Sequence, residues 1–136
     1  MGLVVDTSAV MAVLLDEPGA ADLVQHLDSA RPAVMSAGTR VELGIVAEAR
    51  LGAPAGELLH RLLRDARVTI VDVDPDLAER AISAWRRFGR GRHPAGLNYG
   101  DCFAYALADR TGYPLLCTGD DFARTDLPTV RPTAER

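Results

Sequence analysis

The sequence predicts a single α/β domain in which a central, mostly parallel sheet is covered by helices on both faces. Short apolar or β-branched runs alternate with longer helical segments along the chain, which is the pattern of repeated strand–helix–strand units. The 136 residues are 48% hydrophobic and 25% charged, as in one ordinary folded domain. No repeat, low-complexity tract or linker divides residues 1–136, and only about 132–136 are expected to form a loose tail.

The expected elements of the N-terminal half are a strand over 2–5, helices over 9–15 and 20–29, a strand over 32–36, and helices over about 38–51 and 54–66. Asp6, Thr7 and Ser8 precede the first helix and are residue types that cap helix N-termini. Pro18 and Gly19 follow that helix and end it.

The expected elements of the C-terminal half are a strand over 68–73, a helix over 75–88, a helix opened by Asp101 within 97–108, and strands over 114–118 and 129–131. The run "VTIVDV" is rich in β-branched residues, which favour strands. Asp74 and Pro75 open the next helix, since Asp caps a helix and Pro fits its first turn. Asp101 opens an otherwise uncharged helix, "CFAYALA".

The composition excludes several kinds of chemistry. All 15 basic residues are Arg, and the chain contains no Lys. A Walker A phosphate loop and a Schiff-base enzyme both need a lysine amine, so neither fits. The net charge of −4 argues against general affinity for nucleic acid, because that affinity depends on basic surface. Any contact with nucleic acid must therefore depend on a local basic patch or on metal ions.

The expected location is the cytoplasm, with no membrane contact. The apolar run at 9–15 is too short to span a bilayer. No basic residue precedes Asp6, so the start of the chain does not resemble a signal peptide. Cys102 and Cys117 lie far apart and form no metal-ligand pattern. We expect both to be reduced, buried, apolar side chains.

Three aspartates are expected at one edge of the sheet. Asp6 follows the first strand directly, and Asp120 follows the strand at 114–118 across a Thr-Gly turn. Asp101 opens a helix that we expect to begin at the same edge. Ligands of such sheets bind beyond the carboxyl ends of the strands. Each aspartate alone is explained as a cap or turn residue, but their shared placement indicates a site.

Glu42 is the fourth candidate. On a helix, Val41, Ile45, Val46 and Ala49 form one apolar stripe, and Glu42 lies in the middle of it. A carboxylate that faces a core is costly unless it is paired or binds a cation. The alternative to cation binding is that Glu42 forms a structural ion pair with an arginine.

Four converging carboxylates would predict a metal site. Two anions about 4 Å apart repel each other by about 4 kcal/mol at an effective dielectric constant near 20. A hard divalent cation relieves this repulsion, and oxygen ligands favour Mg²⁺ or Mn²⁺ over Zn²⁺. The three histidines, His26, His60 and His93, are scattered along the chain and make a poor ligand set.

Four motifs in this order and spacing, "VVDTSAV", the helical Glu42, "LNYGDCFAYALA" and "LLCTGDDF", resemble the PIN domain. More narrowly, they are similar to the VapC toxin ribonucleases of bacterial toxin–antitoxin pairs. The resemblance covers residues 3 to about 130. It implies a PIN-like three-layer fold, Mg²⁺- or Mn²⁺-dependent cleavage of an RNA phosphodiester, a small antitoxin partner and a homodimer.

The resemblance also assigns roles to the residues. The acidic positions of the family's metal-binding active site correspond to Asp6, Glu42, Asp101 and Asp120. Asp6 and Asp101 are expected to bind metal directly, while the other two complete the site or bind through water. Asp120 is preferred to its neighbour Asp121 because it follows Thr-x. The residues expected to orient the carboxylates are Thr7, Ser8, Asn98, Thr118 and Asp121.

The segment "WRRFGRGRH" is a candidate RNA-binding surface. Its basic residues are Arg86, Arg87, Arg90, Arg92 and His93. Arginines beside aromatic rings suit phosphate contact and base stacking. The alternative is that the first two arginines only favour a helix C-terminus. Trp85 is expected to pack in the core.

Two other function classes share part of this pattern. A phosphatase or phosphotransferase of the haloacid-dehalogenase type also uses acids at strand ends, but it needs an Asp-x-Asp pair and a Lys. The pair in "DVDPD", Asp72 and Asp74, is better explained as a strand residue and a helix cap. The second class is a PIN-fold binding module without catalysis, against which the intact acidic set argues.

Overall fold

The computed structural model describes residues 1–133. Its elements are β1 (Leu3–Val5), α1 (Thr7–Leu14), α2 (Ala20–Ser29), β2 (Ala33–Ser36), α3 (Ala37–Leu51), α4 (Ala55–Asp65), β3 (Val68–Val71), α5 (Pro75–Phe88), α6 (Tyr99–Thr111), β4 (Leu115–Leu116), the short 3₁₀ helix η1 (Phe122–Arg124) and β5 (Thr129–Val130). Every expected helix and strand is present, with bounds that differ by a few residues. Only η1 was not expected.

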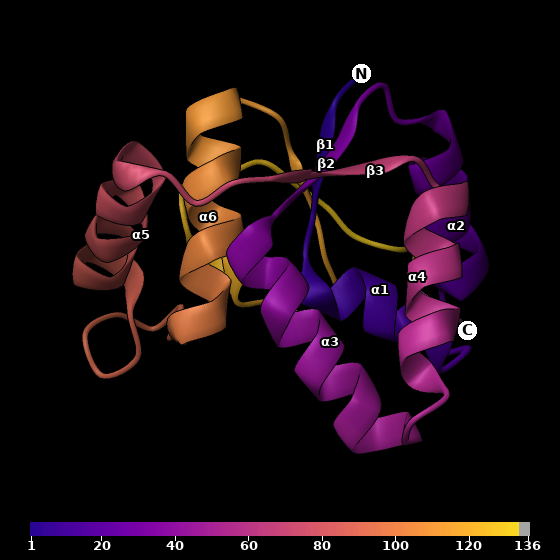
Figure 1. Ribbon diagram of the computed structural model, residues 1–136. Helices are drawn as coiled ribbons and strands as arrows, with labels where there is room; N and C mark the ends of the chain where they lie inside the picture. The colour runs from indigo at the N-terminus through magenta and orange to yellow at the C-terminus, as the bar shows by residue number, and fades with distance from the viewer. Residues whose placement is uncertain (134–136) are drawn as a thin grey trace.

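The sheet is parallel throughout the described residues and has the strand order β3-β2-β1-β4-β5. Leu3 of β1 lies opposite Ala33 of β2. On the other side of β1, Val5 lies opposite Leu116 of β4. Because β1 is central and all strands point the same way, the residues that follow β1, β2 and β4 meet at one edge (Figure 1). The predicted fold class is confirmed.

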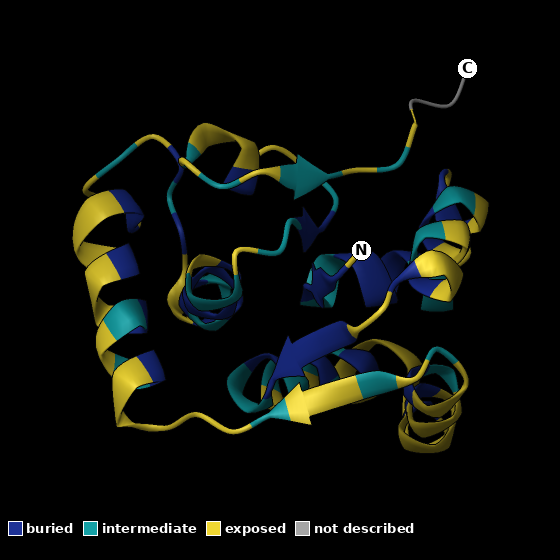
Figure 2. Ribbon diagram, turned by 90° about the horizontal axis from the view of Figure 1, so that it is seen from above, coloured by how far each residue is buried: buried dark blue, intermediate teal, exposed yellow. Residues whose placement is uncertain are grey.

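Two hydrophobic cores cover the two faces of the sheet. Side chains of a strand alternate between faces, so Leu3 and Val5 pack with α1–α4 while Val4 packs with α5 and α6. Figure 2 shows β2 buried and β3 more exposed, as befits the edge strand. No helix within residues 1–133 is long and apolar enough to cross a membrane.

Helix α6 is the most buried helix of the second core. Cys102, Tyr105 and Leu107 are all at most 5% exposed, which explains why residues 102–108 carry no charge. Cys102 and Cys117 are buried free thiols, as expected. Packing against the sheet and α5 holds the helix in place, and α6 also contacts α3 (Figure 1). Gly100 of α6 lies against Glu42 of α3.

Helix α3 turns a different face to the core from the one predicted. Thr39, Leu43 and Ala47 are its buried residues. Val41 and Ile45, which belonged to the predicted core stripe, are 62% and 65% exposed. The stripe prediction was therefore wrong. Periodicity finds an apolar face, but it does not tell whether that face meets the core or an outer hollow, and both of these side chains line hollows on the surface.

The expected tail at 132–136 lies partly outside the described residues. Pro132 and Thr133 are described, and the backbone N–H of Thr133 donates to Asp22 Oδ2 at 3.1 Å. Positions 134–136 fall outside the described range.

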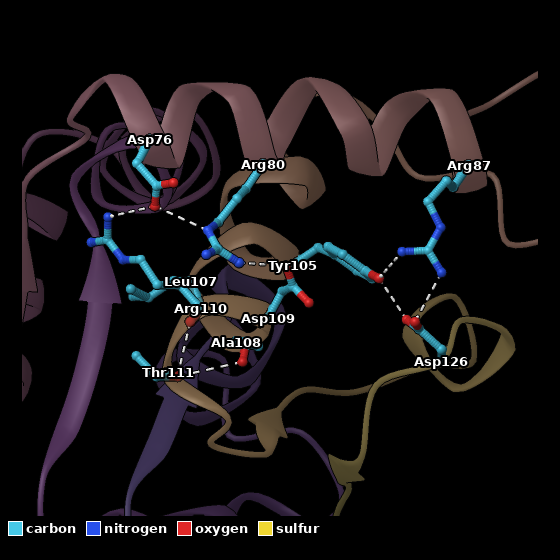
Figure 3. A network of polar contacts seen from close by, with 10 residues as sticks. All are labelled: Asp76, Arg80, Arg87, Tyr105, Leu107, Ala108, Asp109, Arg110, Thr111 and Asp126. Carbon is cyan, nitrogen blue, oxygen red and sulfur yellow. Dashed lines mark hydrogen bonds and ion pairs between the residues drawn. The ribbon is translucent and has the colours of Figure 1, made fainter.

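A polar network joins α5, α6 and the segment after η1 (Figure 3). Tyr105 Oη donates to Asp126 Oδ1 at 2.5 Å, and Arg87 Nη2 donates to Asp126 Oδ2 at 2.9 Å. The hydrogen bond from Tyr105, with that from Arg87, lowers the pKa of Asp126 below its usual value. The network thus ties the C-terminal segment to the helical layer.

We expect Asp126→Asn to lower the free energy of unfolding at pH 7 by about 0.5–1 kcal/mol, a small value because the Asp126 side chain is half exposed. A carboxyl with a depressed native pKa stabilises the fold above its unfolded pKa of about 4 and loses this effect as pH falls below it. Urea unfolding at pH 7 and pH 3 measures the difference. Asp65→Asn, in the exposed pair with Arg64, is the control. An equal loss for Asp126→Asn at both pH values would contradict the assignment.

Candidate active site

Asp6 leaves β1 and caps α1 from a buried position. Its Oδ2 accepts the backbone N–H of Ser8 at 3.0 Å and the Ser8 hydroxyl at 2.6 Å. The residue is only 3% exposed, and its Oδ1 is buried without any hydrogen-bond partner in the described structure. Burial, with a smaller contribution from the charge of Glu42, raises the pKa of Asp6 against the opposing hydrogen bonds from Ser8. Capping therefore accounts for one oxygen of this carboxylate and leaves the other unexplained.

Ser8 connects the ends of two strands. While its hydroxyl donates to Asp6, its Oγ accepts the backbone N–H of Thr118 at 3.0 Å. Thr118 follows β4, and Asp6 follows β1. The hydroxyl thus fixes the orientation of the Asp6 carboxylate relative to the neighbouring strand, the kind of role predicted for Ser8 and Thr118.

Glu42 comes from the second turn of α3 and reaches across to α1. Its Oε1 accepts a 2.7 Å hydrogen bond from the Thr7 hydroxyl. Among residues 1–133 it forms no ion pair with an arginine, which was the alternative explanation for its position. Together with Asn98 and Gly100, Glu42 lines a surface hollow of about 470 Å³. The carboxylate is therefore held by Thr7 and open to a ligand.

Asp101 and Asn98 cap α6 reciprocally. Asn98 Oδ1 accepts the backbone N–H of Asp101 at 2.8 Å, and Asp101 Oδ2 accepts the backbone N–H of Asn98 at 3.1 Å. Burial raises the pKa of Asp101 to about 7, with further contributions from the charges of Asp6, Glu42 and Asp121. Asp101 does help to cap α6, but capping does not explain why the charges of three other carboxylates act on it.

The acidic residues after β4 diverge. Asp120 Oδ1 accepts a 2.8 Å hydrogen bond from Arg131, and its side chain is 69% exposed. Asp121, the next residue, is the one whose charge adds to the repulsion at Asp101. Gly119 has φ +78°, a left-handed conformation that few other residues adopt. Asp120 is thus paired with Arg131, and the charge of Asp121 acts on Asp101, so both remain candidates for the fourth acid.

The site has the chemistry of a hard-cation site. The candidate ligands are carboxylate oxygens, burial and the neighbouring charges raise the pKa of Asp6 and Asp101, and Asp6 Oδ1 lacks a partner in the described structure. A divalent cation would satisfy each of these features. Within residues 1–133, no three acidic, histidine or cysteine side chains are already positioned to hold a metal ion together. Cation binding would therefore require small side-chain movements, of which Glu42 and Asp121 are capable.

Trp85 is 46% exposed, so the prediction that it packs in the core was wrong. Helix α5 buries the stripe that contains Ala84 and Phe88, and Trp85 lies beside that stripe. The guanidinium of Arg92 stacks 4.7 Å from the centre of the indole ring, and its Nε donates to the carbonyl of Arg86 at 3.1 Å. This arrangement leaves an Arg–Trp pair on the surface.

The other basic side chains of this segment have different surroundings. Arg87 is engaged by Asp126, and His93 Nδ1 accepts a backbone N–H two residues on. Arg90 lines an apolar hollow of about 1010 Å³ that Asn98 also lines. Of the predicted RNA-binding residues, Arg90 is thus connected to the acidic site by a continuous surface.

Sequence reasoning missed Gly100. A Cβ at this position would lie 2.0 Å from Glu42 Oε2. A glycine directly before a candidate ligand and inside a helix was the only signal available in the sequence.

The PIN domain family matches this chain over residues 3–127. Ribonuclease VapC30 of Mycobacterium tuberculosis is 46% identical over 128 residues, covering 94% of this chain and 98% of that protein. Ribonuclease VapC of Mycolicibacterium smegmatis is 48% identical over 128 residues, covering 94% and 99%.

Solved structures agree on the fold. The crystal structure of VapC20 of Mycobacterium tuberculosis, described as a toxin that cleaves the sarcin–ricin loop, has a TM-score of 0.76 at 21% identity and covers 96% of this chain and 100% of that one. VapBC2 of Rickettsia felis, bound to promoter DNA, has a TM-score of 0.74 at 13% identity, covering 98% and 100%. At these identities the likeness shows the fold alone, while the curated relatives and the domain match confirm the resemblance read from the motifs. The chain belongs to the PIN-domain family and, within it, to the VapC ribonucleases.

Proposed function

We propose that this protein is a metal-dependent endoribonuclease that acts as the toxin of a toxin–antitoxin pair and hydrolyses RNA phosphodiester bonds with Mg²⁺ or Mn²⁺. The observation that carries the proposal is the buried Oδ1 of Asp6, which has no partner in the described structure, together with the neighbouring charges that add to the raised pKa of Asp6 and Asp101. Such a cluster is unfavourable in a protein without a cation. Family membership supplies the reaction class.

Asp6 and Asp101 are the residues that would hold the cation, with Glu42 and Asp121 completing the set. When bound, a divalent cation neutralises charge on a phosphate and makes water easier to deprotonate. The chain has no lysine to meet phosphate charge. Ser8 fixes Asp6, and Thr7 fixes Glu42. Glu42 lines the hollow and accepts no backbone hydrogen bond in the described structure, so we assign it the proton from the attacking water.

A single assay compares the three function classes. The purified protein is incubated with labelled RNA and, separately, with a phosphomonoester, in Mn²⁺, in Mg²⁺ and in EDTA. The proposal expects RNA cleavage with either metal and none in EDTA. Hydrolysis of the monoester alone would indicate the phosphatase class, and no hydrolysis of either substrate would indicate a binding module.

We also propose an antitoxin partner, supported by the solved complexes of related toxins with antitoxins. A small protein encoded beside this gene should bind the chain and inhibit RNA cleavage. A homodimer is expected from the family, and light scattering of the free protein measures it. An RNA substrate and such a partner both imply action in the cytoplasm.

Arg90 is the basic residue that we expect to contact RNA beside the site. Each phosphate that a basic residue neutralises adds about 0.7–0.9 to the slope of log affinity against log salt, so removing one such residue reduces the slope by that amount. We expect Arg90→Ala to weaken RNA binding and reduce this slope by about that amount, and Arg90→Ala/Arg92→Ala to reduce it further. Fluorescence anisotropy with an inactive protein at several salt concentrations measures the slope. Arg64→Ala, on the exposed face of α4, is the control, and an unchanged slope in the double variant would refute the assignment.

A further inference from the structure

Gly100 leaves a space that the Glu42 carboxylate fills. A Cβ built on Gly100 would lie 2.0 Å from Glu42 Oε2, 2.3 Å from Cδ and 2.7 Å from Oε1. Real Cβ atoms essentially never approach another atom closer than 3.0 Å. All three close atoms belong to Glu42, so any side chain at position 100 competes with this one carboxylate.

The backbone does not require a glycine at this position. Gly100 lies within α6 and is absent from the residues with positive φ. Alanine is the better helix former at such positions, so a buried glycine here calls for a packing reason. Gly56, in α4, is the opposite case, because a Cβ there would meet no atom within 4 Å.

We propose that Gly100 is a positioning residue, and that its missing side chain lets α3 deliver the Glu42 carboxylate to the first turn of α6, beside Asp101. Thr7 holds this carboxylate from α1, so Glu42 lies between the N-terminal turns of two helices. Those turns carry partial positive charge, which favours an anion. The consequence for catalysis rests on the proposed function above, whereas the placement of Glu42 does not.

When a methyl group is added at position 100, Glu42 is the partner that moves. The start of α6 is fixed by the reciprocal cap between Asn98 and Asp101 and by packing of the helix between the sheet and α5. The Glu42 carboxylate, in contrast, is the far end of a flexible side chain with a single hydrogen bond from Thr7. The expected result of Gly100→Ala is a displaced Glu42 in an otherwise intact fold.

The first experiment compares Gly100→Ala with the matched control Gly56→Ala. We expect the melting temperature of both variants to be unchanged or slightly higher, because each adds a good helix former. Only Gly100→Ala should weaken Mn²⁺ binding to the purified protein, measured from the free-Mn²⁺ EPR signal, and lower kcat for RNA, both by about tenfold or more. A variant that unfolds, or one that binds Mn²⁺ as wild type does, would overturn the proposal.

The second experiment asks whether Gly100 acts through Glu42. In a Glu42→Ala background there is no carboxylate to displace, so adding Gly100→Ala should change the Mn²⁺ affinity by less than about twofold, within the additivity of independent sites. A full tenfold loss in that background would show that Gly100 acts elsewhere. A crystal structure of metal-free Gly100→Ala should show the Thr7–Glu42 hydrogen bond broken, and an intact bond would also refute the proposal.

These outcomes separate the two proposals. If the wild-type protein cleaves no RNA in Mn²⁺, the proposed function fails, while the crystal structure still tests the position of Glu42. If the wild type cleaves RNA and Gly100→Ala does so equally well with the same Mn²⁺ affinity, only the role of Gly100 fails.

Discussion

Asp101→Asn is expected to reduce RNA cleavage by a factor of about 10³ or more and, at the same time, to stabilise the metal-free protein. The loss of cleavage follows from removing a charge that the active site holds in a water-poor setting. The gain in stability follows from the raised pKa of Asp101, about 7, because ionising this partly buried carboxyl opposes folding. The amide can still accept the hydrogen bond from Asn98, so the cap of α6 is retained.

The stability effect has a defined pH window. A carboxyl whose native pKa is raised imposes no penalty below its unfolded pKa of about 4; the penalty grows as pH rises toward 7 and is constant above. Each pKa unit corresponds to about 1.36 kcal/mol, so the raised pKa limits the penalty on the free energy of unfolding to about 4 kcal/mol. We expect Asp101→Asn to raise the free energy of unfolding by on the order of 2 kcal/mol at pH 8. Thermal or urea unfolding in EDTA at pH 8 and pH 4.5 measures it.

Two results would contradict the prediction for Asp101. Asp109→Asn is the matched control and should retain RNA cleavage. Asp109 lies on α6, as Asp101 does, and forms an exposed ion pair with Arg80 of α5. If Asp101→Asn cleaved RNA at the wild-type rate, the residue would be outside the site. If the variant were less stable than wild type at pH 8, capping rather than the acidic cluster would dominate its energetics.

Asp121→Asn is expected to lower RNA cleavage by about 10²-fold, whereas Asp120→Asn should leave it within about threefold of wild type. Asp121 is the acid that adds charge at Asp101, while Asp120 is neutralised by Arg131. The two variants remove the same group from adjacent positions, so each is the other's control. Single-turnover cleavage at saturating Mn²⁺ makes the comparison.

If Asp120→Asn lowered cleavage more than Asp121→Asn did, Asp120 would be the fourth acid, as the motif indicated. In that case the Arg131–Asp120 pair would have to open when metal and RNA bind. Arg131→Ala would then be expected to raise cleavage, because it would free Asp120. With Asp121 as the fourth acid, Arg131→Ala should have little effect on the rate.

The sequence was sufficient for the fold and for placing candidate acids at one edge of the sheet. Alternation of strand and helix patterns predicted a parallel sheet, and a parallel sheet brings the ends of β1 and β4 to one edge. Asp6 could therefore be placed beside the start of α6 before any coordinates. The orienting role of Ser8 was expected from the family resemblance, and the structure shows its hydroxyl donating to Asp6.

Predictions that depended on which side of a helix meets the core were less reliable. The stripe of Val41 and Ile45 looked like a core face, but both are exposed, and the buried face of α3 is formed by Thr39, Leu43 and Ala47. The prediction that Trp85 packs in the core was wrong for the same reason. Periodicity reports that apolar residues share a face, and it does not say what that face contacts.

The sequence by itself determined that several carboxylates follow strands at the carboxyl edge of a parallel sheet. Local patterns and the shared direction of the strands are enough to predict this. Only the tertiary structure shows that Asp120 pairs with Arg131 while the charge of Asp121 acts on Asp101, and that the Glu42 carboxylate occupies the space beside Gly100. Both depend on contacts between different segments of the chain, such as the packing of α6 against α3. A distance of a few ångströms between such segments is fixed by packing and leaves no periodic signal in the sequence.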